Sequence, residues 1–166
     1  MSDAEALRYA IAEIIPFNHA LNISITSVFP DRVELIQPEA PERLNAVGAV
    51  HTAASALFML GEAATEAMVI HAFHHLLKEE GVVPFVVKTT ISYYRPTRGE
   101  LRGISILSSE EQTSIRDEMV STGRTRFTIS THIHEESGML VAELESQWGL
   151  RKPRVKELGW AINALT

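Results

Sequence analysis

The longest apolar segment of the chain runs from about Thr52 to at least Met68, and most of its positions are hydrophobic or small. A segment that is apolar on nearly every face predicts a helix buried on several sides. This helix can extend through Leu77 to a stop at Gly81. Ionised glutamate is seldom fully buried unless another group pairs with it. Glu62, the first carboxylate in the segment, is therefore the first residue that needs an explanation.

Shorter stretches in which polar and apolar positions alternate predict strands. The clearest covers residues 86–94, with Thr89 and Ile91 on one side of the strand and Thr90 and Ser92 on the other. The remaining predicted elements are a helix over residues 2–15 that ends at Pro16, a loop over 38–50, strands over 21–28, 32–37, 100–107, 124–134 and 139–148, and a short polar helix over 110–120. Because one apolar helix cannot cover itself, the pattern predicts an α+β fold with a sheet wrapped around the helix.

Composition narrows the class of protein. The chain has 166 residues, of which 45% are hydrophobic and 22% charged, and no linker or repeat divides it, so we expect a single domain over residues 1–166. The net charge of -6 argues against a nucleic acid or an anionic membrane as partner, since both attract a positive surface. The absence of cysteine excludes disulfides and Cys-ligated zinc. The acidic N-terminus does not resemble a signal peptide, and no stretch reaches the roughly 20 apolar residues of a membrane helix, so a cytoplasmic protein is expected.

Three segments resemble a known superfamily. They are NAVGAVHTAASALFMLGEAA (45–64), ISYYRPTRGEL (91–101) and the segment 123–152. Together they resemble the hotdog-fold thioesterases, in particular the phenylacetate-pathway branch and related bacterial hotdog proteins, over roughly residues 20–152. The resemblance implies a hotdog fold, a curved antiparallel sheet around a long central helix, that pairs through its sheets into a homodimer, often a dimer of dimers (a homotetramer). It also implies hydrolysis of acyl thioesters, usually of acyl-CoA, at a site between subunits and without a cofactor.

The chemistry of thioester hydrolysis asks for two groups. Unpaired amides at a helix N-terminus stabilise a developing oxyanion, and a carboxylate attacks the carbonyl or activates water. By resemblance, Asn45, Gly48 and His51 match the turn before the helix, and Glu62 matches the acid. In this assignment Glu62 is the base or nucleophile, and Asn45 and His51 orient the reactants.

The spacing departs from the family pattern. The family has a small pair after the histidine and its acid nine residues on, whereas here Glu62 lies eleven residues after His51. Two residues rotate a helix by about 200°. One interpretation is that the helix begins two residues later, with Ala53 and Ala54 near the oxyanion. The other is that the acid position falls on Leu60 and the chain lacks this activity.

Polar residues on the helix also have a simpler interpretation. At helical spacing His51, Ser55, Glu62 and Glu66 share one stripe, which can face solvent or a partner subunit. For Glu66, solvation or salt bridging is the simpler account. Asn45 either bonds its own backbone or positions a reactant.

Other candidates lie on the neighbouring strands. Thr90 and Ser92 either help to place the water or are simply outward-facing strand residues. Arg95 and Arg98 form a basic cluster that either binds the phosphates of coenzyme A or is a solvated surface. For the basic residues after the last strand, residues 151–156, the solvated surface is favoured.

Histidines and cofactor motifs add little. His71, His74 and His75 have a spacing that can bind a metal, but no carboxylate motif accompanies them. The preferred interpretation is that they lie on a partly exposed helix end, and no metal is expected. His132 and His134 indicate a polar outer strand face. We find no phosphate loop, nucleophile elbow or dinucleotide fingerprint.

The sequence therefore predicts an oligomeric acyl-CoA thioesterase. The alternative is a non-catalytic acyl-CoA or lipid-binding hotdog module. A dehydratase on the same fold is less favoured, because no paired histidine and acid of that kind is evident.

Overall fold

The computed structural model describes residues 16–45 and 51–153. The predicted N-terminal helix over residues 2–15, the turn residue Gly48 and the basic residues Arg154 and Lys156 lie outside these ranges.

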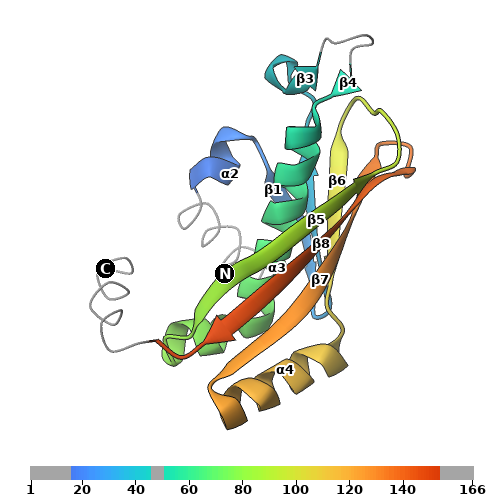
Figure 1. Ribbon diagram of the computed structural model, residues 1–166. Helices are drawn as coiled ribbons and strands as arrows, with labels where there is room; N and C mark the ends of the chain where they lie inside the picture. Colours follow the sequence, from blue (N-terminus) through green and yellow to red (C-terminus); the bar gives the residue numbers. More distant parts are fainter. Residues whose placement is uncertain (1–15, 46–50, 154–166) are drawn as a thin grey trace.

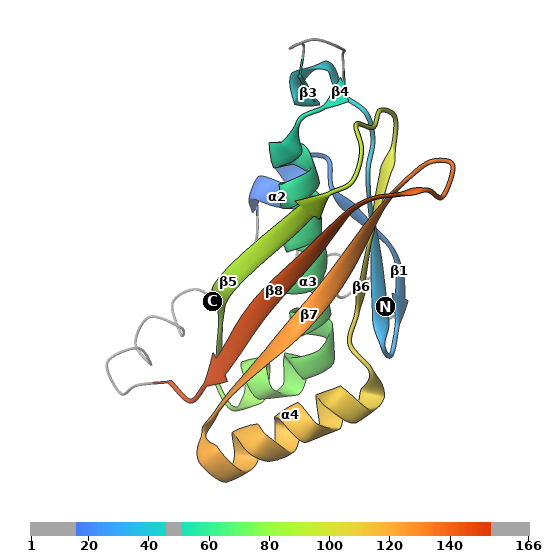
Figure 2. The ribbon, with the colours of Figure 1, turned by 45° about the vertical axis from the view of Figure 1, so that its right-hand side comes forward.

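A six-stranded sheet in the order β1-β2-β6-β7-β8-β5 wraps around the long helix α3 (Figures 1 and 2). All of its neighbouring strands are antiparallel. The elements are α2 (Pro16–Ala20), β1 (Ser24–Phe29), β2 (Arg32–Gln37), a 3-10 helix (Pro41–Arg43), β3 (Leu44–Asn45), β4 (His51–Thr52), α3 (Ala54–Glu79), β5 (Val83–Tyr93), β6 (Leu101–Ile106), α4 (Ser109–Thr122), β7 (Arg124–Glu135) and β8 (Leu140–Arg151). The predicted α+β hotdog architecture is confirmed.

The core lies between α3 and the inner face of the sheet. Leu60, Ala64 and Met68 of the helix are fully buried. Two glycines allow the close approach of helix and sheet: a Cβ on Gly61 would lie 2.6 Å from a leucine methyl of β8, and one on Gly103 would lie 3.1 Å from Leu60. By length and composition alone α3 is apolar enough to cross a membrane, but 67% of its most apolar window is buried inside the structure, as in a core helix.

The start of α3 differs from the prediction by two residues. Thr52 belongs to β4, and its amide donates to the carbonyl oxygen of Thr97 at 2.8 Å. The loop predicted over residues 38–50 contains the 3-10 helix and β3. Pro16, where the N-terminal helix was expected to end, is the first described residue of α2. Proline is tolerated in the first turn of a helix because the N–H groups there have no acceptor within the helix.

The other elements follow the predicted pattern closely. α4 begins with a capping box between Ser108 and Glu111 and ends at Gly123, whose φ of 76° suits glycine. α3 continues beyond Leu77 as expected, although Phe73 has non-helical backbone angles (φ -122°, ψ 16°) that kink it. This kink was not predicted.

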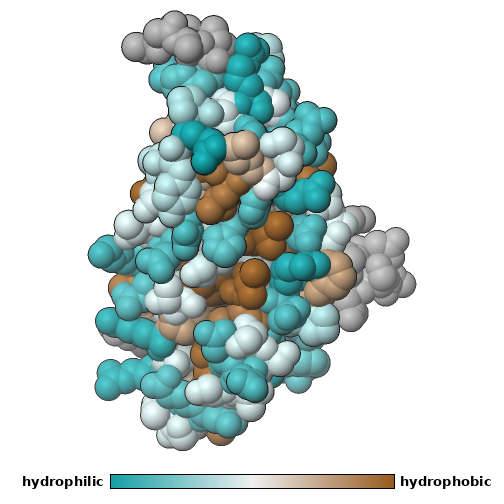
Figure 3. All heavy atoms as spheres, turned by 90° about the vertical axis from the view of Figure 1, so that its right-hand side faces the viewer, coloured by the Kyte–Doolittle hydropathy of each residue, from teal (hydrophilic) through white to brown (hydrophobic). Residues whose placement is uncertain are grey.

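The outer face of the sheet is turned away from α3 and carries mixed side chains. Figure 3 shows a broken band of hydrophobic residues among hydrophilic ones on this side. Ile106 is 43% exposed there. His132 lies 3.8 Å from a carboxylate oxygen of Glu143, in agreement with the polar strand face predicted for the histidines.

Candidate active site

The N-terminus of α3 is held in place by main-chain hydrogen bonds. Ala53 is the N-cap, with φ -64° and ψ 142° and no side-chain cap. Its amide donates to the carbonyl oxygen of Arg43 at 2.7 Å, so that amide is not available to a ligand, contrary to the prediction for Ala53. The amides of Ala54 and Ser55 donate to no recorded acceptor in residues 16–45 and 51–153. These two N–H groups are the donors that a helix N-terminus offers to an oxyanion.

Asn45 and His51 lie on the two short strands that precede α3. They are paired across the two-stranded ladder of β3 and β4, and both are half-buried. Because β4 leads directly into Ala53, the ladder lies just before the start of α3. The structure thus pairs two of the three residues that the sequence placed in the turn, Asn45 and His51.

Glu62 is half-buried on the face of α3 that meets β5 and β8. The hydroxyl of Thr89 on β5 donates a hydrogen bond to its Oε1 atom. That hydroxyl lies 3.0 Å from the Oγ atom of Ser146 on β8, which is fully buried. A chain of hydroxyls in two strands therefore orients the carboxylate.

The structure also bears on the two interpretations of the helix register. Leu60 is fully buried, and its side chain packs where Gly103 leaves room. The observed helix start at Ala54 is the one that the first interpretation assumes.

Thr90 and Ser92 do not lie beside Glu62 in this chain. Both are exposed, and they follow the alternation that sends neighbouring strand residues to opposite faces. Their partners on β8 are Glu145 and Glu143. Thr89, which sequence reasoning passed over, makes the contact instead, and the predicted alternation had already set it apart from Thr90.

Glu66 lies one helical turn beyond Glu62 and is half-buried. Burial, and secondarily the charge of Glu62, raise the pKa of the Glu66 carboxyl to about 7. Within the described ranges its side chain forms no ion pair, so of the two accounts given for Glu66, solvation and salt bridging, the second is not found. The helix therefore carries two carboxyl groups one turn apart: Glu62 accepts a hydrogen bond from Thr89, and Glu66 has its pKa raised by burial.

Arg95 and Arg98 flank the same end of α3. They lie on either side of Thr97, whose carbonyl accepts the bond from β4. A guanidinium nitrogen of Arg98 lies 3.4 Å from a carboxylate oxygen of Glu39, and Arg95 donates to the sulfur of Met139. Both side chains are exposed, so they remain accessible from solvent.

The three histidines of α3 do not form a metal site in the described part of the chain. The Nδ1 atom of His74 lies 3.2 Å from the carbonyl oxygen of His71. The Nδ1 atom of His75 lies 3.0 Å from Glu79.

One chain cannot bring the helix N-terminus and Glu62 to the same carbonyl group. Glu62 lies eight residues after Ala54, and at 1.5 Å per residue this separates the two positions by about 12 Å along the helix axis. A glutamate side chain does not span that distance, even though helical side chains lean toward the N-terminus. In each chain the N-terminus of α3 and the Glu62 carboxylate therefore lie in two separate places.

The comparisons with known proteins agree with this architecture. A family model described as a domain of unknown function (DUF4442) matches residues 3–150. A structure from Pseudomonas aeruginosa, a protein of unknown function described as a probable thioesterase, has a TM-score of 0.77 and 25% identity and covers 90% of this chain and 95% of its own. A protein of unknown function from Chlorobaculum tepidum has a TM-score of 0.78 and 18% identity, with 90% and 94% covered.

A third relative shares the fold at lower identity. The PaaI protein from the phenylacetic acid degradation operon of E. coli has a TM-score of 0.65 and 15% identity, with 92% of this chain and 94% of that chain covered. No curated protein matches the sequence. The match over nearly the whole chain shows that this chain belongs to the DUF4442 family, and its fold is that of the hotdog proteins of the thioesterase superfamily.

Proposed function

We propose that the protein hydrolyses acyl thioesters, with acyl-CoA as the substrate, and that Glu62 is the general base or nucleophile. The observation that carries the proposal is the half-buried Glu62 carboxylate held by Thr89 on the concave side of the sheet. A carboxylate that is fixed in position and partly removed from water is suited to activate a water molecule or to attack a carbonyl.

The oxyanion is bound by the amide of Ala54, with that of Ser55 beside it. Both donors lie in the first turn of a helix of 26 residues, where the macrodipole also favours negative charge. Preorganised donors of this kind stabilise the tetrahedral intermediate more than the planar thioester. Asn45 and His51 orient the reactants from the adjoining ladder, and Arg95 and Arg98 bind the phosphates of coenzyme A.

The complete site is formed by two copies of the chain. The separation along α3 requires Glu62 of one copy to act on a thioester bound at Ala54 of the other. β5 is an edge strand, and Val86, Val87 and Tyr93 on it are 42%, 39% and 47% exposed. A long edge with exposed apolar side chains is suited to pair with the same edge of a second copy. A dimer of dimers can then form through the outer faces of the sheets.

The first test measures hydrolysis of a panel of acyl-CoA thioesters by the wild type and by Glu62→Gln. The variant keeps the size of the side chain and should lose activity while still binding substrate. Glu110→Gln, an exposed residue in the first turn of α4, is the matched control. If the wild type binds but hydrolyses no thioester, the chain is an acyl-CoA-binding module, and if Glu62→Gln hydrolyses normally, the assignment is wrong.

The second test separates the two halves of the site. Ala54→Pro removes the amide donor at a position where a helix tolerates proline, and the extended backbone of Ala53 already suits a following proline. We expect kcat to fall about 100-fold. A mixture of Ala54→Pro and Glu62→Gln chains should regain activity, because one site in each mixed dimer has both intact groups. If mixed dimers are shown to form and activity does not recover, the proposal of a site shared between two copies is wrong.

A further inference from the structure

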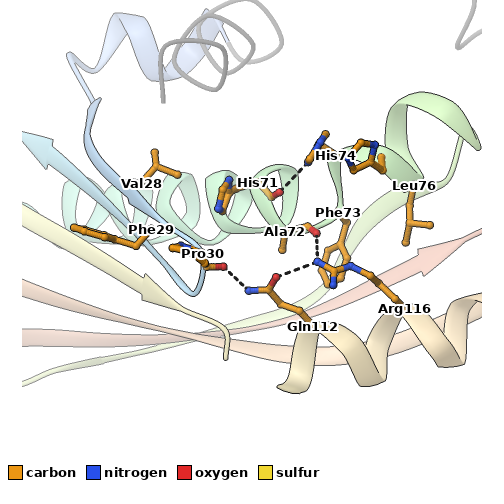
Figure 4. Close-up of a pocket in the computed structure, with 11 residues that line it drawn as sticks. Val28, Phe29, Pro30, His71, Ala72, Phe73, His74, Leu76, Gln112 and Arg116 are labelled. Atoms are coloured by element: carbon orange, nitrogen blue, oxygen red, sulfur yellow. Dashed lines mark hydrogen bonds between the residues drawn. The ribbon is translucent and has the colours of Figure 1, made fainter. Parts of the chain in front are cut away.

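A pocket of about 460 Å³ lies at the opposite half of α3 from the helix N-terminus. Figure 4 shows it between three elements: the turn that joins β1 to β2, the second half of α3 and the helix α4. Its apolar wall includes Val28, Phe73 and Leu76. The volume falls within the range of about 300–1,000 Å³ that is usual for small-molecule sites.

The walls of the pocket are tied together by a chain of hydrogen bonds. Arg116 on α4 donates to the carbonyl oxygen of Ala72 at 2.9 Å and to Oε1 of Gln112 at 3.1 Å. The Gln112 residue is 5% exposed, and its Nε2 atom donates in turn to the carbonyl oxygen of Pro30 at 2.7 Å. The hydrogen bond to Ala72 lies directly before the kink of α3 at Phe73. The pocket is therefore held open by contacts that do not depend on a ligand.

The charges around the pocket favour an anion. The guanidinium carbon of Arg116 lies 5.9 Å from the centre of the Phe73 ring, and within the described ranges Arg116 forms no ion pair with a carboxylate. The described lining residues include three histidines, His71, His74 and His75, and no aspartate or glutamate. His75 lies 3.0 Å from the carboxylate of Glu79, which does not line the pocket. Arg116 is thus a fixed cation beside an apolar wall, in a chain whose net charge is -6.

We propose that this pocket binds an amphipathic carboxylate, with its hydrocarbon chain against Val28, Phe73 and Leu76 and its carboxylate on the guanidinium of Arg116. The planar guanidinium has donors beyond the two bonds that it makes within the wall, and it matches a carboxylate geometrically. Acids of this class are also what thioester hydrolysis releases, so the pocket would let such a product bind apart from Glu62. The binding itself does not depend on the proposed hydrolysis.

Isothermal titration calorimetry with sodium decanoate tests the proposal on the full chain. Decanoate should bind at least ten-fold more tightly than decanol, which has the same chain without the charge. Arg116→Gln should weaken decanoate binding about ten-fold or more, since a hydrogen bond to a charged group is lost. Arg124→Gln, an exposed arginine at the start of β7 outside the pocket, should leave it unchanged.

Two further variants keep the result unambiguous. Val28→Trp fills the pocket without touching the hydrogen-bond chain and should abolish binding even if Arg116→Gln fails to fold. Glu62→Gln should bind decanoate as the wild type does, which distinguishes this pocket from the proposed active site. The proposal is overturned if decanoate does not bind, if decanol binds equally well, or if Val28→Trp binds normally.

Discussion

Replacing Glu66 by glutamine should stabilise the protein at pH 8 and have little effect at pH 4.5. The pKa of this carboxyl is raised from its ordinary value of 4.5 to about 7, chiefly by burial and then by the charge of Glu62. In the unfolded chain the group loses its proton from about pH 4.5 upward, whereas in the folded protein it keeps the proton until about pH 7. Stability is therefore fully present below pH 4.5 and is lost as the pH rises through 7.

The size of the effect follows from the two values. Their difference corresponds to about 3 kcal/mol at 1.36 kcal/mol per pH unit. Because Glu66 keeps part of its contact with solvent, we expect Glu66→Gln to gain about 2 kcal/mol at pH 8. Glutamine keeps the size of the side chain and cannot ionise, so this cost of ionisation disappears.

Urea denaturation of the wild type and Glu66→Gln at pH 4.5, 6 and 8 provides the measurement. The protein concentration must be the same throughout, because stability depends on it for any oligomer. The difference in unfolding free energy should grow between pH 4.5 and 7 and then level off, while the dependence on urea concentration stays the same. Glu110→Gln, on the exposed face of α4, should show no such growth. A constant difference at all three pH values would refute the reasoning.

Three other substitutions probe the packing and the site. Thr89→Val removes the hydroxyl that orients Glu62 and should lower kcat for thioester hydrolysis about ten-fold, whereas Thr90→Val on the other face should leave kcat unchanged. Gly61→Ala places a Cβ 2.6 Å from a leucine methyl of β8 and should lower the unfolding free energy by about 1–3 kcal/mol in urea. An unchanged urea midpoint would mean that helix and sheet can separate at no cost. Ser108→Ala breaks the capping box of α4 and should cost about 1 kcal/mol, seen as a lower thermal midpoint.

Most of the fold could be predicted because its elements are set by local patterns. The alternation over residues 86–94 predicted the strand and separated Thr89 from Thr90, and the apolar run predicted the central helix. The pattern could not say which strand face meets α3, since that depends on pairing with residues far along the chain. The contact between Thr89 and Glu62 is of this long-range kind.

The start of α3 could not be predicted for a related reason. A helix N-cap is recognised in sequence by a serine, threonine, aspartate or asparagine, and here the N-cap is Ala53, which has no capping side chain. The boundary is set by bonds from its amide to Arg43 and from the preceding amide to Thr97. The kink at Phe73 likewise carries no proline or glycine that would mark it.

The main-chain anchoring of α3 has a consequence for how relatives of this protein are recognised. Since peptide groups rather than a capping side chain fix the first turn, the N-cap position needs no particular side chain, and the number of residues between the histidine and the acid can change as the ladder before the helix lengthens. A motif written as letters at fixed intervals would pass over such chains. A description in terms of where the first free amide lies, and which strand hydroxyl faces the acid, would retain them.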